Sequence, residues 1–289
     1  MLTLASLAQI LVNGLAAGVF YVLMALGFTL IFGILRLVNF AHGEFYMLGA
    51  FVVYHLYAQL GMNFFLALAA AAVAVAAVGV LVERVVFAPL RSRELSMLMS
   101  ALGLQIALQG IMAVLEGVEG LSLPSPVQGV YRSGWITFPY DRLLVVGAGL
   151  VVLGLFYVFL TWTRLGQALR AVAQDGDAAL MQGIPVNFVY TAAFAIGCGL
   201  AAIGGGLIGP VFSLQVYMGQ PALLKAFIVV ILGGLGSVPG ALVGGLVLGL
   251  GESAFATLFG GLTSDMFGFL MIMGILLWKP TGLLGRAEA

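Results

Sequence analysis

The stretch RLGQALRAVAQDGDAALMQGIP, residues 164–185, interrupts two long apolar runs at 142–162 and 187–213. Its first half has a helical period, because apolar residues recur at i, i+3, i+4 and i+7 and polar residues occupy the other side. The apolar stripe consists of Leu165, Ala168, Leu169 and Val172. We therefore expect a short amphipathic helix that lies outside the apolar runs.

A second short helix is expected in the other half of this stretch. Asp175 or Asp177 can cap its N-terminus, Gly183 can adopt the left-handed conformation after its end, and Pro185 prevents continuation. Residues 164–186 would then form a compact helical loop rather than a flexible tether. Such a loop is suited to binding a partner protein.

The composition places the rest of the chain in a bilayer. Of 289 residues, 63% are hydrophobic and 8% are charged, and this much apolar surface does not fit inside a water-soluble globule. The runs are unbroken rather than alternating, so they predict helices and not barrel strands. A formal net charge of zero argues against nucleic-acid binding. Cys198, the single cysteine, allows no intramolecular disulfide.

The runs predict an all-α polytopic bundle, with about eight transmembrane helices in a single domain, 1–289. The first run is one helix or two, and the Gly-broken region from 222 to 278 holds two or three spans. Within that region, 233–240 contains Pro239 and predicts a broken or re-entrant segment. The runs lie at 6–35, 45–60, 63–88, 95–115, 142–162, 187–213 and 222–278.

Basic residues cluster in three places that the positive-inside rule assigns to the cytoplasm. The chain segment between the first two clusters, 116–141, is rich in Pro and Gly and would form an ordered external loop. No Lys or Arg precedes Arg36, so the first run lacks the basic region of a cleaved signal peptide and is expected to be a retained span. The clusters are Arg84, Arg91 and Arg93; Arg164 and Arg170; and Lys279 and Arg286.

Polar residues near the first span have two interpretations. Asn39, His42 and Glu44 separate two apolar runs, and polar groups at membrane depth usually face a solute path or each other. Alternatively they form a short interfacial turn in which Glu44 favours a helix N-terminus. Spacing alone leaves both interpretations open.

Three further ionisable residues lie in or beside the last apolar region. Glu252 is the best candidate for genuine burial along the path, whereas an interfacial or snorkelling position is expected for Lys225 and Asp265. No catalytic constellation, metal cluster or Walker-type phosphate loop is evident, so we expect neither enzymatic activity nor a cofactor.

Several motifs resemble the LivH-type permeases of ABC transporters that import branched-chain amino acids. They are NFAHGE (39–44) with MLG (47–49), RAVAQD (170–175) with GIP (183–185), LGGLGSVPG (232–240) and PTGLLGR (280–286). The resemblance spans essentially the whole chain. DAALMQG (177–183) also resembles the first half of the EAA loop by which ABC permeases contact their ATPase, but the second half of that pattern is absent.

The resemblance implies a multi-subunit importer in the bacterial or archaeal cytoplasmic membrane. Its partners would be a homologous second permease, two cytoplasmic ATPase subunits that bind the ATP, a periplasmic solute-binding protein and membrane lipid. The ATPase would contact the loop 164–186. The contact residues would be Arg164, Gly166, Arg170, Asp177, Ala178, Ala179 and Gly183.

Two alternatives remain open from the sequence. A self-sufficient secondary transporter or channel would be expected to contain buried relays and often an internal repeat, and the sequence shows no convincing repeat. Related permeases also serve other solutes, so urea or amides are alternative substrates to branched-chain or other hydrophobic amino acids.

Overall fold

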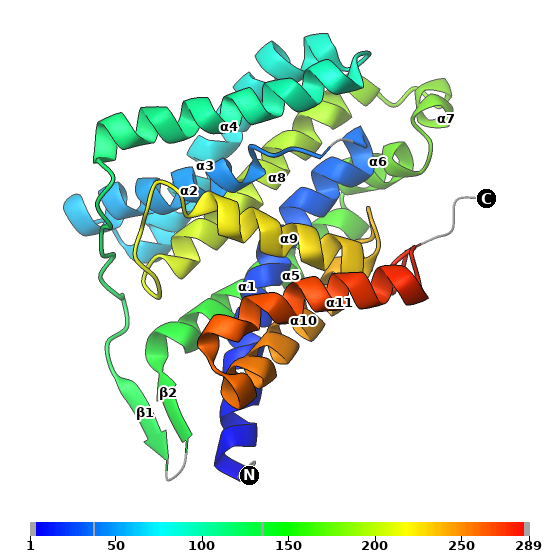
Figure 1. The fold of residues 1–289 in the computed structure, drawn as a ribbon. Coiled ribbons are helices and arrows are strands. Elements are labelled where there is room, and N and C mark those ends of the chain that lie inside the picture. The colour runs from blue at the N-terminus through cyan, green and yellow to red at the C-terminus, as the bar shows by residue number, and fades with distance from the viewer. Residues whose placement is uncertain (1–3, 37, 134–135, 286–289) are drawn as a thin grey trace.

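The computed structural model describes residues 4–36, 38–133 and 136–285, most of which lie in one helical bundle (Figure 1). Short π-helical turns extend α2 over Tyr54–Gln59 and α3 over Glu83–Phe87, and 3-10 turns lie at Ala88–Leu90 and Gly261–Thr263. The helices are α1 (Leu4–Leu35), α2 (His42–Val53), α3 (Phe64–Val82), α4 (Glu94–Glu116), α5 (Tyr140–Trp162), α6 (Arg164–Gln174), α7 (Gly176–Met181), α8 (Val186–Ile208), α9 (Gly219–Gly233), α10 (Val238–Phe259) and α11 (Ser264–Trp278).

The helical membrane architecture expected from the apolar runs is confirmed. Within the described residues, six helices are long and apolar enough to cross a membrane, and α9 and α11 are shorter apolar helices. The first run is a single helix, α1, and the Gly-rich region contains three, α9 to α11. The helical structure is interrupted between Gly233, where α9 ends, and Val238, where α10 begins. The glycines and Pro239 predicted this interruption. The chain is therefore a multi-pass membrane protein.

A small β-hairpin departs from the all-α expectation. Strands β1 (Val130–Ser133) and β2 (Ile136–Pro139) pair antiparallel in the connection between α4 and α5, with Val130 opposite Pro139. Four-residue strands carry too few alternating positions to stand out beside spans of about twenty apolar residues. The hairpin lies at the same end of the bundle as the start of α1 (Figure 1).

The opposite end of the bundle gathers the described basic clusters. Arg91 donates a hydrogen bond of 2.7 Å to the Asn187 side chain and its guanidinium lies 4.6 Å from the centre of the Tyr190 ring. The α3–α4 loop therefore meets the start of α8, beside α6 and α7 (Figure 1). The positive-inside rule predicts that this end faces the cytoplasm.

Helices α2 and α9 meet through their N-termini inside the bundle. A Cβ atom added to Gly43 of α2 would lie 2.3 Å from the carbonyl oxygen of Gly219 in α9, and one added to Gly219 would lie 2.4 Å from the carbonyl oxygen of Gly43. The contact is thus reciprocal. At 15 residues, α9 is about 22 Å long, shorter than the roughly 30 Å hydrocarbon core.

The helices around this contact repeat the same packing order. α1 packs on α10 as α8 packs on α3, α2 contacts α3 and α4, and α9 contacts α10 and α11. α2 runs away from the cytoplasmic end and α9 runs toward it (Figure 1). The bundle therefore contains an inverted structural repeat, which the sequence alone does not reveal.

Candidate functional site

The polar residues before and within α2 lie deep inside the bundle. The side chains of Asn39, His42 and Glu44 are all inaccessible to solvent. Asn39 Oδ1 accepts a hydrogen bond of 3.1 Å from the Ala41 N–H and so forms the turn that starts α2. Glu44 lies in the first turn of α2, and its side chain is fully buried within the bundle.

Some polar atoms of this group lack a partner. Glu44 Oε1 accepts a hydrogen bond of 2.8 Å from Gln109 of α4, whereas Glu44 Oε2 and Asn39 Nδ2 are buried without a hydrogen bond to any described residue. The His42 ring packs edge-on against Phe28 of α1, with 5.8 Å between ring centroids. Buried polar atoms without partners are costly, so these residues, the α2 polar group, are candidates for contact with water or solute in another state.

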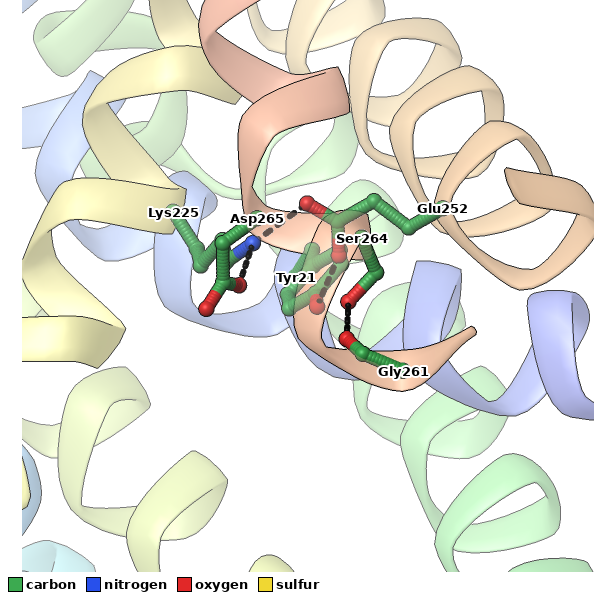
Figure 2. Close-up of polar contacts among 6 residues, drawn as sticks. All are labelled: Tyr21, Lys225, Glu252, Gly261, Ser264 and Asp265. Carbon is green, nitrogen blue, oxygen red and sulfur yellow. Dashed lines mark hydrogen bonds and ion pairs between the residues drawn. The ribbon is translucent and has the colours of Figure 1, made fainter. Parts of the chain in front are cut away.

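A second polar group joins four helices (Figure 2). The Lys225 ammonium of α9 pairs with the Glu252 carboxylate of α10 and, at 2.8 Å, with Asp265 Oδ1 of α11. The Tyr21 hydroxyl of α1 donates a hydrogen bond of 2.6 Å to Glu252 Oε2. At the start of α11, the Ser264 hydroxyl donates to the Gly261 carbonyl oxygen.

Tyr21, Lys225, Glu252 and Asp265 form this charged cluster. Their contacts show where the ionisable residues of the last apolar region lie. Glu252 is buried, as the sequence suggested, with 6% of its surface exposed. The Lys225 side chain is 16% exposed, and its ammonium bridges the buried Glu252 and the exposed Asp265. Only Asp265, with 75% of its side chain exposed, has the peripheral position that was expected for both.

A buried polar contact near the cytoplasmic end was not anticipated. Glu83 is fully buried, pairs with Arg91 and accepts a hydrogen bond of 2.6 Å from the Thr191 hydroxyl of α8. The signal was present in the sequence, since a lone acid at the end of an apolar run requires a partner. This contact fixes the α3–α4 loop against the start of α8.

The helical loop between α5 and α8 has the predicted form. Asp175 is the N-cap of α7, and its carboxylate accepts hydrogen bonds of 3.0 Å from the N–H groups of Asp177 and Ala178. Gly183 has the left-handed conformation, with φ of 79°. Leu169 of the apolar stripe is buried against the bundle, 1% exposed. Two short helices, α6 and α7, are thus confirmed.

Two of the expected contact residues face inward. Ala179 is only 4% exposed, and a Cβ atom on Gly166 would lie 2.3 Å from the Phe159 carbonyl oxygen. Both therefore serve the packing of the loop onto the permease and are unavailable to an ATPase. The other expected residues are exposed, as are two apolar side chains that the sequence reading missed. The exposed set is Arg164, Arg170, Asp177, Ala178, Leu180, Met181 and Gly183.

Two cavities lie along the seam between α1 and α5. The outer cavity, of about 150 Å³, includes Ala17, Phe20, Tyr21, Arg142, Val145 and Phe212 in its lining. The inner cavity, of about 70 Å³, includes Thr29, Ile34, Leu160, Leu169 and Arg170. Tyr21 and Thr29 are about 12 Å apart along α1, and the helix between them is buried. Buried residues of α1 thus separate the two cavities.

The described residues show no metal centre, since they contain no group of three His, Cys, Asp or Glu side chains able to hold an ion. The site consists instead of the α2 polar group, the charged cluster, the two cavities and the cytoplasmic loop. All of these belong to membrane helices or to the segments that connect them.

Comparison with known proteins gives a consistent result over the whole chain. The chain is 36% identical over 295 residues to the high-affinity branched-chain amino acid transport system permease protein BraD of Pseudomonas aeruginosa, with 97% of this chain and 96% of BraD covered. It is 37% identical to LivH of Escherichia coli K12, with the same coverage.

A more distant relative is a second permease of the same kind. LivM of Escherichia coli K12 is 28% identical over 293 residues, covering 91% of this chain and 67% of LivM. The family model for the branched-chain amino acid transport system permease component matches residues 10–276, which include all the transmembrane helices except the ends of α1 and α11. This chain therefore belongs to the family of branched-chain amino acid transport permease components.

Proposed function

We propose that this chain is the permease subunit of an ABC importer that carries branched-chain or similar hydrophobic amino acids across the inner membrane. The full-length match to permeases such as LivH supports this function. The similarity to LivM supports pairing with a homologous second permease. ATP hydrolysis would come from two cytoplasmic ATPase subunits, and a periplasmic binding protein would deliver the solute.

Reconstitution tests the proposal against its rivals. The permease pair with its ATPases and binding protein should take up L-leucine into proteoliposomes. This uptake should occur only when ATP is present on the side of the membrane where the ATPase subunits lie. The permease alone should transport nothing. Uphill uptake by the permease alone under a proton or sodium gradient would establish a secondary transporter instead, and ATP-driven uptake of urea or amides without leucine would replace the substrate.

We infer that the loop of α6 and α7 transmits the motion of the ATPase. Its surface exposes Leu180 and Met181, with 61% and 87% of their surfaces accessible, and adjacent exposed apolar side chains on a cytoplasmic loop indicate a protein contact. The same loop reaches the inner cavity through Leu169 and Arg170. A displacement of α6 would therefore change the shape of this cavity directly.

The first prediction is that Met181→Glu abolishes coupling without unfolding the permease. The side chain is 87% exposed, so a carboxylate there is solvated in the free permease but unpaired within an ATPase cleft, at a cost of about 2 kcal/mol or more. We expect at least tenfold weaker ATPase assembly, measured by co-purification, with corresponding loss of uptake. Gln174→Glu adds the same charge on exposed α6 and should assemble normally. Equal assembly of both variants would remove α7 from the contact.

The second prediction concerns the α2 polar group as a gate. Asn39→Asp keeps the Oδ1 atom that accepts from the Ala41 N–H but replaces the unpartnered amide nitrogen with a carboxyl oxygen. A carboxyl group buried there has no partner for its second oxygen, so we expect several-fold slower uptake together with a lower thermal midpoint in detergent. Asn39→Ala also removes the acceptor of the Ala41 N–H and should cost about 1 kcal/mol of stability. Wild-type uptake by Asn39→Asp would exclude the amide from the transport cycle.

A further inference from the structure

The lining of the outer cavity includes Arg142, whose position is electrostatically unfavourable for a positive charge without a bound anion. Arg142 is the third residue of α5, where the positive end of the helix dipole repels a cation. It also lies at the external end of the bundle, where the positive-inside rule disfavours basic residues. Both preferences make a cation at this site unusual.

The contacts of Arg142 leave it able to bind an anion. Its guanidinium donates to Asn13 Oδ1 of α1, and among the described residues no carboxylate forms an ion pair with it. A guanidinium has five N–H donors in a planar fork that matches a carboxylate. The described lining of the cavity contains no other charged side chain.

The rest of the lining is apolar and of suitable size. Ala17, Phe20 and Val145 form walls that a hydrocarbon group can contact. A cavity of about 150 Å³ corresponds to one that takes up a benzene-sized molecule, and the branched side chain of leucine is smaller than benzene. The side chain of such an amino acid would fill the cavity while its carboxylate lies at Arg142.

Tyr21 connects this cavity to the charged cluster. Its ring lines the cavity, and its hydroxyl donates to Glu252, which pairs with Lys225 (Figure 2). The Tyr21 side chain is thereby held in place by a hydrogen bond to Glu252 of α10. A solute in the cavity would contact α1, α5 and, through Tyr21, the contact between α9 and α10.

We propose that the outer cavity is a binding site for a small carboxylate solute with a branched aliphatic side chain, with Arg142 as the carboxylate-binding residue. The inference rests on the proposed function, which supplies the substrate class. It assigns the permease itself a site that selects for a carboxylate, in addition to any selection by a binding protein.

Cysteine protection in the assembled permease and ATPase complex, without binding protein, tests the site. Ala17→Cys introduces a thiol into the cavity lining, and Cys198, the native cysteine, is fully buried. We expect saturating L-leucine to slow modification by a small thiosulfonate at least fivefold, whereas isoamylamine, which lacks the carboxylate, should not. Leu11→Cys, on the same helix and 61% exposed, should react equally with and without leucine.

Arg142 is tested in the Ala17→Cys background. Arg142→Gln should raise the leucine concentration for half-protection by about tenfold or more, because it removes a charge-assisted pair. Arg142→Lys should recover part of the loss. If Arg142→Gln does not assemble, Ala17→Leu fills the cavity and leaves the arginine intact. It should impair leucine uptake while ATP hydrolysis stimulated by the binding protein persists.

The outcomes separate the site from the proposed function. Absence of leucine protection, or equal protection with Arg142→Gln, overturns the site even when the unchanged complex imports leucine. A thiol at position 17 that reacts only after anionic lipid is omitted from the nanodisc also overturns it, because the cavity then holds lipid. Failure of the unchanged complex to import leucine overturns the proposed function, and the inference with it.

Discussion

Gly43→Ala should destabilise the permease by about 3 kcal/mol, the upper end of the usual cost of overpacking a core. The added methyl would lie 2.3 Å from the Gly219 carbonyl oxygen. Backbone occupies both sides of this contact, so no side chain can rotate to relieve the overlap. α2 and α9 would have to separate where their N-termini meet. We expect a lower thermal midpoint in detergent and little assembled complex.

Gly103→Ala is the matched control for this change. Gly103 lies in α4, is exposed, and a Cβ atom there would meet nothing within 4 Å. The same substitution should therefore be neutral or stabilise the helix by up to about 1 kcal/mol. A thermal midpoint for Gly43→Ala equal to that of Gly103→Ala would show that the reciprocal contact does not determine the packing of α2 and α9.

The membrane helices and the cytoplasmic loop could be predicted because each depends on local sequence. An apolar run of sufficient length requires a helix in lipid. Asp175, Gly183 and Pro185 identify the ends of a short helix from their own backbone preferences. The inverted repeat could not be predicted in this way. The repeat is recognised from contacts such as that of Gly43 with Gly219, which join residues far apart in the sequence.

The candidate site was predicted less completely than the fold because side-chain direction depends on tertiary packing. Ala178 and Ala179 are equivalent by composition, yet Ala178 is exposed and Ala179 is buried. An interfacial or snorkelling position was expected for Lys225. Its partners Glu252 and Asp265 come from α10 and α11, and only the fold brings these residues together.

Lys225→Met should be among the most damaging substitutions in the bundle, at about 3–5 kcal/mol, because it leaves the Glu252 carboxylate buried without its countercharge. Glu252 is 6% exposed, and Tyr21 alone would then stabilise it. We expect a large fall in the thermal midpoint of the purified permease in detergent. Asp265→Asn is the control, because it removes the charge of the second carboxylate that pairs with Lys225. Its side chain is 75% exposed, so the change should cost less than about 1 kcal/mol.

The double variant Lys225→Met with Glu252→Gln distinguishes two causes of instability in Lys225→Met. One is the loss of the attraction between Lys225 and Glu252, and the other is the buried Glu252 charge that is left without a partner. Replacing both partners by neutral groups removes the desolvation penalty together with the pair, so the double variant should be more stable than Lys225→Met alone. The Gln side chain still offers an oxygen to the Tyr21 hydroxyl. A double variant as unstable as the sum of its single changes would contradict this explanation. Recovered stability with lost leucine uptake would instead assign the buried charges to transport, because the fold tolerates their removal and the solute path does not.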